Sequence, residues 1–295
     1  MLPARPLKRR QEKQMDVIGV VGAGQMGNGI AHVAAAAGFR VVLQDVSADA
    51  LAAALVTIRK NLGRQVKKER MTQAEADAVS ARIQTTTATA GLSDADLIVE
   101  AATENIELKY RIFEGLDAVA KPGAILATNT SSISVTAIAA RTSRPDHVVG
   151  MHFMNPVPVM KLVELIPGLA TSDEVLQAVR SAAEKMGKTT VVSRDMPGFI
   201  VNRVLMPYIN EAVFAVYEGI ASVEDIDTAM KLGTNVPMGP LTLADFIGLD
   251  TCLAIMQVLH DGMGGDSKYR PCPLLTKYVE AGWLGKKAGR GFYTY

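Results

Sequence analysis

His152 and Glu164 are the residues whose types and spacing best suit proton transfer. They belong to two apolar runs separated by a loop that Pro156 and Pro158 enforce. If residues 161–166 form a strand, its period of two places Glu164 on an apolar face, where a buried carboxylate needs a partner. A carboxylate bonded to one imidazole nitrogen fixes the tautomer and leaves the other nitrogen to exchange a proton with a substrate. Taken alone, the pattern favours a core histidine with a structural hydrogen bond, so the rest of the chain decides between the two.

A glycine-rich motif, G-x-G-x-x-G, occupies residues 22–27, between an apolar run and an alanine-rich helical pattern. A second apolar run follows, so the segment predicts the first β-α-β unit of a dinucleotide-binding fold. In such a unit Gly22 allows the tight turn, Gly24 lets the backbone approach the pyrophosphate, and Gly27 lets the helix contact the strand. The helix N-terminus then presents unpaired N–H groups and a partial positive charge to the phosphates.

Asp45 ends the second apolar run, at the spacing from the glycine motif that a ribose-binding acid has. Its carboxylate is suited to accept hydrogen bonds from the ribose hydroxyls of NAD, and its charge repels the additional phosphate of NADP. No arginine follows in residues 46–48. A solvated turn residue is the alternative explanation of Asp45, but the β-α-β context favours NAD as the cofactor.

Composition agrees with a soluble enzyme, because 295 residues are enough for two domains and the formal net charge of +1 gives no signal for nucleic acid. Cys252 and Cys272 are too few and too far apart for a disulfide framework or a metal site, so we expect a reducing, cytoplasmic location and no metal. No run of about 18 apolar residues appears, so no membrane span is expected. The basic residues 1–14 predict a disordered tail, with a targeting arm or an extension before Met15 as alternatives.

The alternation of strand and helix patterns ends near residue 196, after which only helical spacing remains. We therefore expect a Rossmann-like α/β domain over residues 15–196, with a helical hairpin inserted near residues 51–80, followed by an all-α domain over residues 197–295. In the second domain the helical patterns cover residues 199–218, 223–232, 241–259 and 272–281.

Two further polar residues lie where a site is expected. Ser131 follows a predicted strand over residues 124–127, at the carboxyl edge where open α/β sheets bind ligands. Asn202 shares a helix face with Met206 and Ile209, and a buried amide there requires a partner such as a substrate carbonyl. Taken singly, Ser131 is better explained as a turn or helix cap, and Asn202 as an interdomain hydrogen bond.

Together these residues resemble the NAD-dependent (S)-3-hydroxyacyl-CoA dehydrogenase family, and within it the bacterial 3-hydroxybutyryl-CoA dehydrogenases. The resemblance runs from about residue 15 to residue 295 and rests on residues 22–27, 128–132, 152–158, 197–203 and 289–293. It implies that His152 and Glu164 are catalytic and that Ser131 and Asn202 contact the substrate. The cofactor contacts that it implies are Gly22, Gly24, Gln25, Met26, Gly27, Asp45, Glu104, Lys109, Ser131, Asn155 and Lys287.

The resemblance also maps coenzyme A contacts onto Asn61 and Lys68, although a solvated charged face explains the basic residues near Lys68 about as well. The helical second domain resembles the family's dimerisation region, so a homodimer is expected.

The implied reaction is hydride transfer between NAD and C3 of an acyl-CoA thioester, with His152 moving the proton and Glu164 orienting its ring. One alternative is a dehydrogenase of a free hydroxy acid or sugar acid, which needs no CoA group. The other is a non-catalytic NAD-binding relative, which binds NADH and turns over no thioester. The four residues His152, Glu164, Ser131 and Asn202 argue against this last alternative, because a binding module has no need of them together.

Overall fold

The computed structural model describes residues 15–295, so the tail predicted over residues 1–14 lies outside the described residues. The chain forms two compact units. The first comprises residues 15–129, 138–165 and 170–191, and the second comprises residues 130–137, 166–169 and 192–295. Two short segments that precede residue 196 thus group with the helical unit, while the domain boundary expected there stays a prediction.

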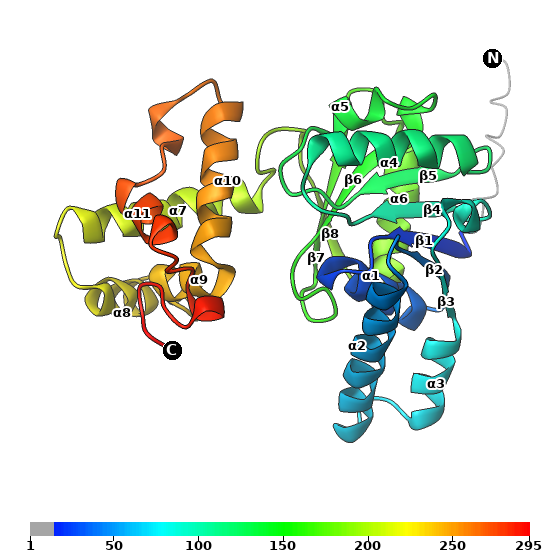
Figure 1. Ribbon diagram of the computed structural model, residues 1–295, viewed down its shortest axis with the longest axis horizontal. Helices are drawn as coiled ribbons and strands as arrows, with labels where there is room; N and C mark the ends of the chain where they lie inside the picture. The colour runs from blue at the N-terminus through cyan, green and yellow to red at the C-terminus, as the bar shows by residue number, and fades with distance from the viewer. Residues whose placement is uncertain (1–14) are drawn as a thin grey trace, which may run out of the picture. The chain divides into compact units, whose positions relative to one another are not determined.

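A sheet of eight strands forms the centre of the first unit, in the order β3-β2-β1-β4-β5-β6-β7-β8 (Figure 1). The strands are β1 Val17–Val21, β2 Arg40–Gln44, β3 Ile83–Thr86, β4 Leu97–Glu100, β5 Ile125–Thr128, β6 Val148–Phe153, β7 Leu162–Pro167 and β8 Thr189–Val192. Neighbouring strands from β3 to β6 are parallel. The order reverses between β1 and β4, and open α/β sheets bind ligands at such a switch point. The predicted Rossmann-like fold is confirmed.

The helices of this part of the chain are α1 Gln25–Ala36, α2 Ala48–Lys67, α3 Gln73–Ala81, α4 Ile106–Val119, α5 Val135–Ala139 and α6 Asp173–Lys185. The helices α2 and α3 pack on each other and extend away from the sheet as a pair (Figure 1). One hydrophobic cluster joins α1, α2, α3 and α6 to alternate strand residues, among them Met151 and Phe153 of β6. Because successive side chains of a strand point to opposite faces, His152 projects from the other face of the sheet.

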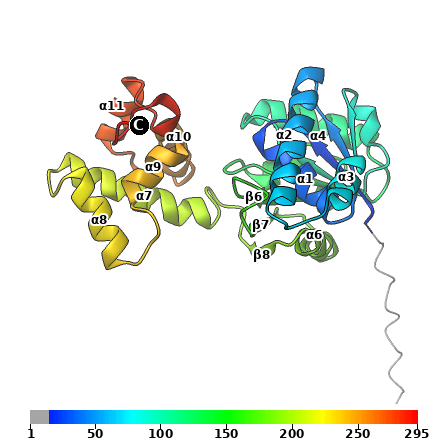
Figure 2. The same ribbon diagram turned by 90° about the horizontal axis from the view of Figure 1, so that it is seen from below.

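The second unit is mainly helical, with α7 Val201–Tyr217, α8 Val223–Gly233, α9 Pro240–Ile247, α10 Leu249–Gly262 and α11 Pro273–Glu280 around one apolar core (Figure 2). The single helix predicted over residues 241–259 is wrong, because α9 and α10 meet at an angle of 97°. Gly248 separates them with φ +104°, a conformation that ends a helix and that residues with a Cβ rarely adopt. Apolar spacing resumes after the break, which is why periodicity did not reveal it.

Within residues 15–295, no single helix is long and apolar enough to cross a membrane. The bent pair of α9 and α10 reaches that length and composition only when the two helices are taken together.

Candidate active site

The glycine-rich turn connects β1 to α1, and its backbone suits a pyrophosphate. Gly22 has φ +94°, and a Cβ added to Gly27 would overlap with the carbonyl oxygen of Gly22. A Cβ added to Gly24 would instead meet no atom within 4 Å, so the backbone there borders open space. Gly24 is also the N-cap of α1 and offers no side chain to the first N–H groups of the helix. Those donors and the partial positive charge of the helix end suit a phosphate group.

Asp45 follows β2 and contacts the glycine-rich turn directly. Its Oδ2 accepts a hydrogen bond from the backbone N–H of Ala23 at 2.7 Å, and its Oδ1 accepts one from the N–H of Ser47 at 2.9 Å. Each carboxylate oxygen keeps a second lone pair, which allows Asp45 to accept ribose hydroxyls as well. The residues present therefore fit NAD, and the structure adds a role that sequence reasoning missed, since Asp45 also orders the turn.

We expect Asp45→Ala to raise the KM for NADH by about 10- to 100-fold, because hydrogen bonds to a charged group contribute about 1.5–3 kcal/mol. The preference for NADH over NADPH should also decrease, because the variant lacks the charge that repels the additional phosphate of NADPH. Steady-state kinetics with both cofactors measures both effects, and Asp49→Ala, which removes an exposed acid from the first turn of α2, serves as the control. A variant that keeps the wild-type cofactor preference would show that Asp45 does not recognise the ribose.

His152 and Glu164 lie on the neighbouring strands β6 and β7. The Nδ1 of His152 is 2.7 Å from Oε2 of Glu164, which is the length of a charge-assisted hydrogen bond. Both side chains are buried, and Glu164 has no exposed surface. The predicted pairing is thus present. The carboxylate holds a proton on Nδ1, so proton exchange with a ligand falls to Nε2.

The loop between β6 and β7, residues 154–161, also contacts the glycine-rich turn and its helix. The side-chain amide of Gln25, at the start of α1, donates to Oδ1 of Asn155 at 3.0 Å. A Cβ added to Gly29 would lie 2.8 Å from Cβ of Val157, so Gly29 lets this loop pack closely on α1. These contacts connect the glycine-rich turn and α1 to the loop that joins the strands of His152 and Glu164. Sequence reasoning singled out Gln25 and Asn155 but missed Gly29.

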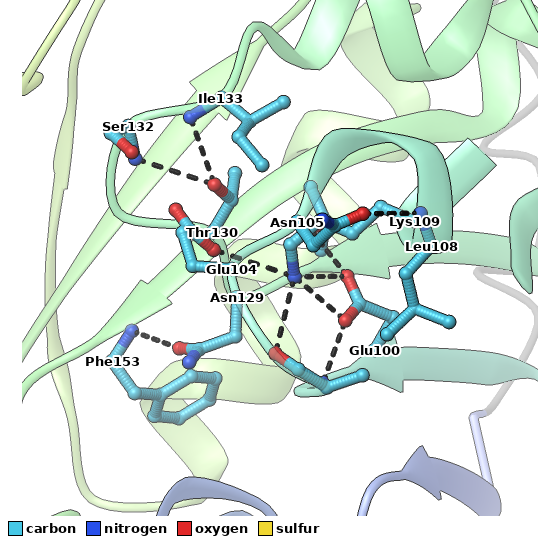
Figure 3. Close-up of polar contacts among 12 residues, drawn as sticks. Glu100, Glu104, Asn105, Leu108, Lys109, Asn129, Thr130, Ser132, Ile133 and Phe153 are labelled. Atoms are coloured by element: carbon cyan, nitrogen blue, oxygen red, sulfur yellow. Dashed lines mark hydrogen bonds and ion pairs between the residues drawn. The ribbon is translucent and has the colours of Figure 1, made fainter. Parts of the chain in front are cut away.

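Sequence reasoning also missed a buried network of hydrogen bonds at the ends of β4 and β5. Glu100 is fully buried and accepts hydrogen bonds from Lys109 Nζ at 2.7 and 2.9 Å and from Thr128 Oγ1 at 2.7 Å. The next residue, Asn129, accepts a hydrogen bond from the backbone N–H of Phe153 at 2.8 Å, beside His152 (Figure 3). A single acid in an apolar strand pattern signals such a network, because a buried carboxylate requires a partner.

Two expected cofactor residues meet in this network. The ammonium of Lys109 is paired with Glu100, and Oε2 of Glu104 lies 3.5 Å from it (Figure 3). Lys109 is fully buried, whereas Glu104 is exposed. Glu104 is therefore the better placed of the two to meet a ligand, and Lys109 holds the strand ends together.

The expected substrate residues Ser131 and Asn202 belong to the second unit. Ser131 is half-buried in a turn in which Thr130 Oγ1 accepts a hydrogen bond from the N–H of Ile133 at 2.9 Å (Figure 3). Asn202 is buried in the first turn of α7, on the face that also carries Met206.

The three remaining expected contacts lie on other elements of the two units. Lys287 pairs with Asp250 at 2.6 Å within the helical unit, and both side chains are about half exposed. Asn61 lies on α2 and Lys68 is its C-cap, with Lys68 exposed. Among the described residues, no group of three or more acidic, histidine or cysteine side chains is arranged to hold a metal ion.

One edge of the sheet thus carries a turn suited to a dinucleotide and, farther along, a histidine held by a buried carboxylate. This combination defines a nicotinamide-dependent dehydrogenase. Residues 17–196 match the family model of the 3-hydroxyacyl-CoA dehydrogenase NAD-binding domain, and residues 198–295 match that of the C-terminal domain. The chain belongs to the 3-hydroxyacyl-CoA dehydrogenase family, as its motifs predicted, and NAD is its cofactor.

The similarity of this chain to curated relatives and to solved structures extends over nearly its whole length. The chain is 60% identical over 278 residues to a 3-hydroxybutyryl-CoA dehydrogenase of Bradyrhizobium diazoefficiens, a match that covers 94% of each protein. It is 59% identical over 276 residues to a probable 3-hydroxybutyryl-CoA dehydrogenase of Bacillus subtilis, covering 94% of this chain and 96% of that protein. The crystal structure of an (S)-3-hydroxybutyryl-CoA dehydrogenase from Ralstonia eutropha matches with a TM-score of 0.93 and 49% identity, covering 96% of this chain and 99% of that one.

Proposed function

We propose that the chain interconverts (S)-3-hydroxyacyl-CoA and 3-oxoacyl-CoA thioesters with NAD, and that its preferred pair is 3-hydroxybutyryl-CoA and acetoacetyl-CoA. The observation that carries this proposal is the 2.7 Å contact between His152 and Glu164 on the sheet that also bears the dinucleotide turn. Relatives that are 59% and 60% identical and are named 3-hydroxybutyryl-CoA dehydrogenases support the four-carbon chain length.

NAD, when bound, accepts or supplies the hydride at the nicotinamide ring. During oxidation Nε2 of His152 removes the proton of the 3-hydroxyl group, and during reduction it returns a proton to the developing alkoxide. Glu164 keeps the imidazole in the orientation and tautomer that this exchange requires, and it stabilises the imidazolium once the ring is charged. Burial of both side chains excludes water from this hydrogen bond and strengthens it.

The remaining site residues have binding roles in this proposal. Ser131 and Asn202 hold the oxygen atoms of the substrate, and Asn61 and Lys68 meet the coenzyme A portion. Glu104, Asn155 and Lys287 contact the cofactor together with the glycine-rich turn. The hydrogen bond from Gln25 supports the role of Asn155, because it holds the amide beside the nucleotide helix.

A kinetic series of 3-oxoacyl-CoA substrates from four to ten carbons, with NADH and NADPH compared, tests the proposal. We expect kcat/KM to be highest for acetoacetyl-CoA with NADH. Turnover of free hydroxy acids or sugar acids without any turnover of thioesters would instead identify a dehydrogenase of free acids. NADH binding without turnover of any member of the series would identify a non-catalytic relative.

We also propose that the protein is a cytoplasmic homodimer. Large apolar side chains that are at least 56% exposed support the dimer, and they lie on α7, α8, α9 and the connection between α7 and α8: Val204, Tyr217, Ile220, Leu232 and Phe246. Two free cysteines, both buried, suit a reducing compartment, and burial raises the pKa of the Cys252 thiol to about 12. Light scattering at micromolar concentration tests the dimer, and a monomer would contradict it.

A further inference from the structure

Lys188 carries a buried ammonium group that has no role in the mechanism above. Only 8% of the residue is exposed, just before β8. Its Nζ donates to the backbone carbonyl oxygens of Val157 at 2.5 Å and of Met160 at 2.8 Å. Within residues 15–295, no carboxylate forms an ion pair with it, and burial lowers the pKa of Lys188. A buried charge held by carbonyl groups alone is costly, so its presence calls for an explanation.

Both carbonyl groups belong to the loop between β6 and β7, which connects the strands of His152 and Glu164. Val157 is the only buried side chain in residues 154–161, so side-chain packing does little to hold this loop. Val157 packs against Gly29 of α1. The ammonium of Lys188 holds the carbonyl groups of Val157 and Met160.

The loop is therefore held by contacts with α1 and with a buried ammonium group. The loop joins the end of β6 to the start of β7, and His152 and Glu164 lie one and two residues from those ends. The loop backbone therefore contributes to the geometry of the hydrogen bond between the two side chains. Catalysis requires this alignment more strictly than folding does, because a misplacement of about 1 Å can lower a rate 10²-fold.

We propose that Lys188 is a positioning residue for the His152–Glu164 pair. By donating to the carbonyl groups of Val157 and Met160, it fixes the loop and thereby the orientation of the His152 imidazole toward the substrate. The kinetic part of this inference rests on the proposed function, whereas the effect on the hydrogen bond between the two side chains does not.

Lys188→Met tests the proposal because it keeps the length of the side chain and removes its donors. With acetoacetyl-CoA and NADH we expect kcat to fall about 10- to 100-fold and the KM for NADH to stay within about twofold. The isotope effect on kcat, measured with NADH deuterated at the transferred position, should rise because the chemical step becomes slower than the other steps. A loss of folded protein would lower kcat and leave both the isotope effect and KM unchanged. Lys185→Met removes an exposed lysine from the same segment and serves as the matched control.

Two further variants separate positioning from folding. The methyl group that Gly29→Ala adds to α1 would lie too close to Val157 and displace the loop. This variant should therefore produce the same combination of a lower kcat and a higher isotope effect even if Lys188→Met does not fold. Lys188→Arg keeps the charge and the donors, and we expect it to recover part of the rate. Wild-type kcat in Lys188→Met, or a lower kcat in both Lys188→Met and Gly29→Ala at an unchanged isotope effect, would overturn the proposal.

Proton NMR of the imidazole supplies a measurement that needs no substrate. The Nδ1–H proton of a histidine bonded to a carboxylate resonates far downfield, and we expect Lys188→Met or Gly29→Ala to shift or broaden this signal. An unchanged signal in both variants would refute the positioning role. If wild-type protein fails to reduce acetoacetyl-CoA while the NMR signal responds to the variants, the proposed function is wrong and the positioning role is supported.

Discussion

His152→Ala is expected to lower the turnover of acetoacetyl-CoA by about 10²- to 10⁴-fold, which is the range that general acid–base catalysis contributes. The effect is large because Nε2 of His152 is the group proposed to exchange the proton at the substrate oxygen, and Glu164 already occupies Nδ1. NADH should still bind, since the glycine-rich turn and Asp45 are unchanged. Measuring kcat together with an NADH fluorescence titration separates the two effects.

The control for this variant is His147→Ala, which removes a histidine that lies just before β6 and pairs with Asp146 near the surface. We expect it to keep wild-type turnover. Near-normal turnover of His152→Ala would remove His152 from the mechanism and return it to the role of a core histidine.

Glu164→Gln should be the second most damaging change, with kcat lowered by on the order of 10²-fold. Glutamine keeps the shape of the side chain but loses the charge that stabilises the imidazolium and holds a proton on Nδ1. Because Glu164 is completely buried, water molecules cannot readily compensate for the lost negative charge. Steady-state kinetics with acetoacetyl-CoA and NADH measures the effect.

Two companion variants make the result for Glu164 decisive. Glu174→Gln changes an exposed acid in the first turn of α6 and should leave kcat unaltered. A melting temperature of Glu164→Gln close to that of the wild type assigns the loss of rate to chemistry. A harmless Glu164→Gln substitution would mean that the carboxylate is structural.

Local patterns accounted for most of the fold. The period of two in the strands and the alanine-rich helix after residues 22–27 are read from neighbouring residues, and the structure forms α1 there. The break at Gly248 escaped the same reasoning, because the apolar spacing on its two sides agrees with a single helix although the backbone turns by 97°.

Contacts between distant segments were harder to foresee. Lys188 and Val157 are 31 positions apart, and nothing in either segment indicates that a lysine ammonium meets a loop carbonyl. The contact between Gly29 and Val157 depends in the same way on how α1 packs against the loop. A lone acid such as Glu100 in an apolar run indicates that a partner exists, but several lysines satisfy that requirement equally in the sequence.

The sequence by itself determined the kind of fold, the candidate turn for the dinucleotide and the candidate proton-transfer residues, because each depends on residue types at short, regular spacings. Only the tertiary structure decided that Nδ1 of His152 meets Glu164 at 2.7 Å, that Asp45 orders the glycine-rich turn, and that Lys109 pairs with Glu100. The physical reason is that such contacts depend on the order of the strands and on packing between segments remote in the chain, and no local spacing encodes these.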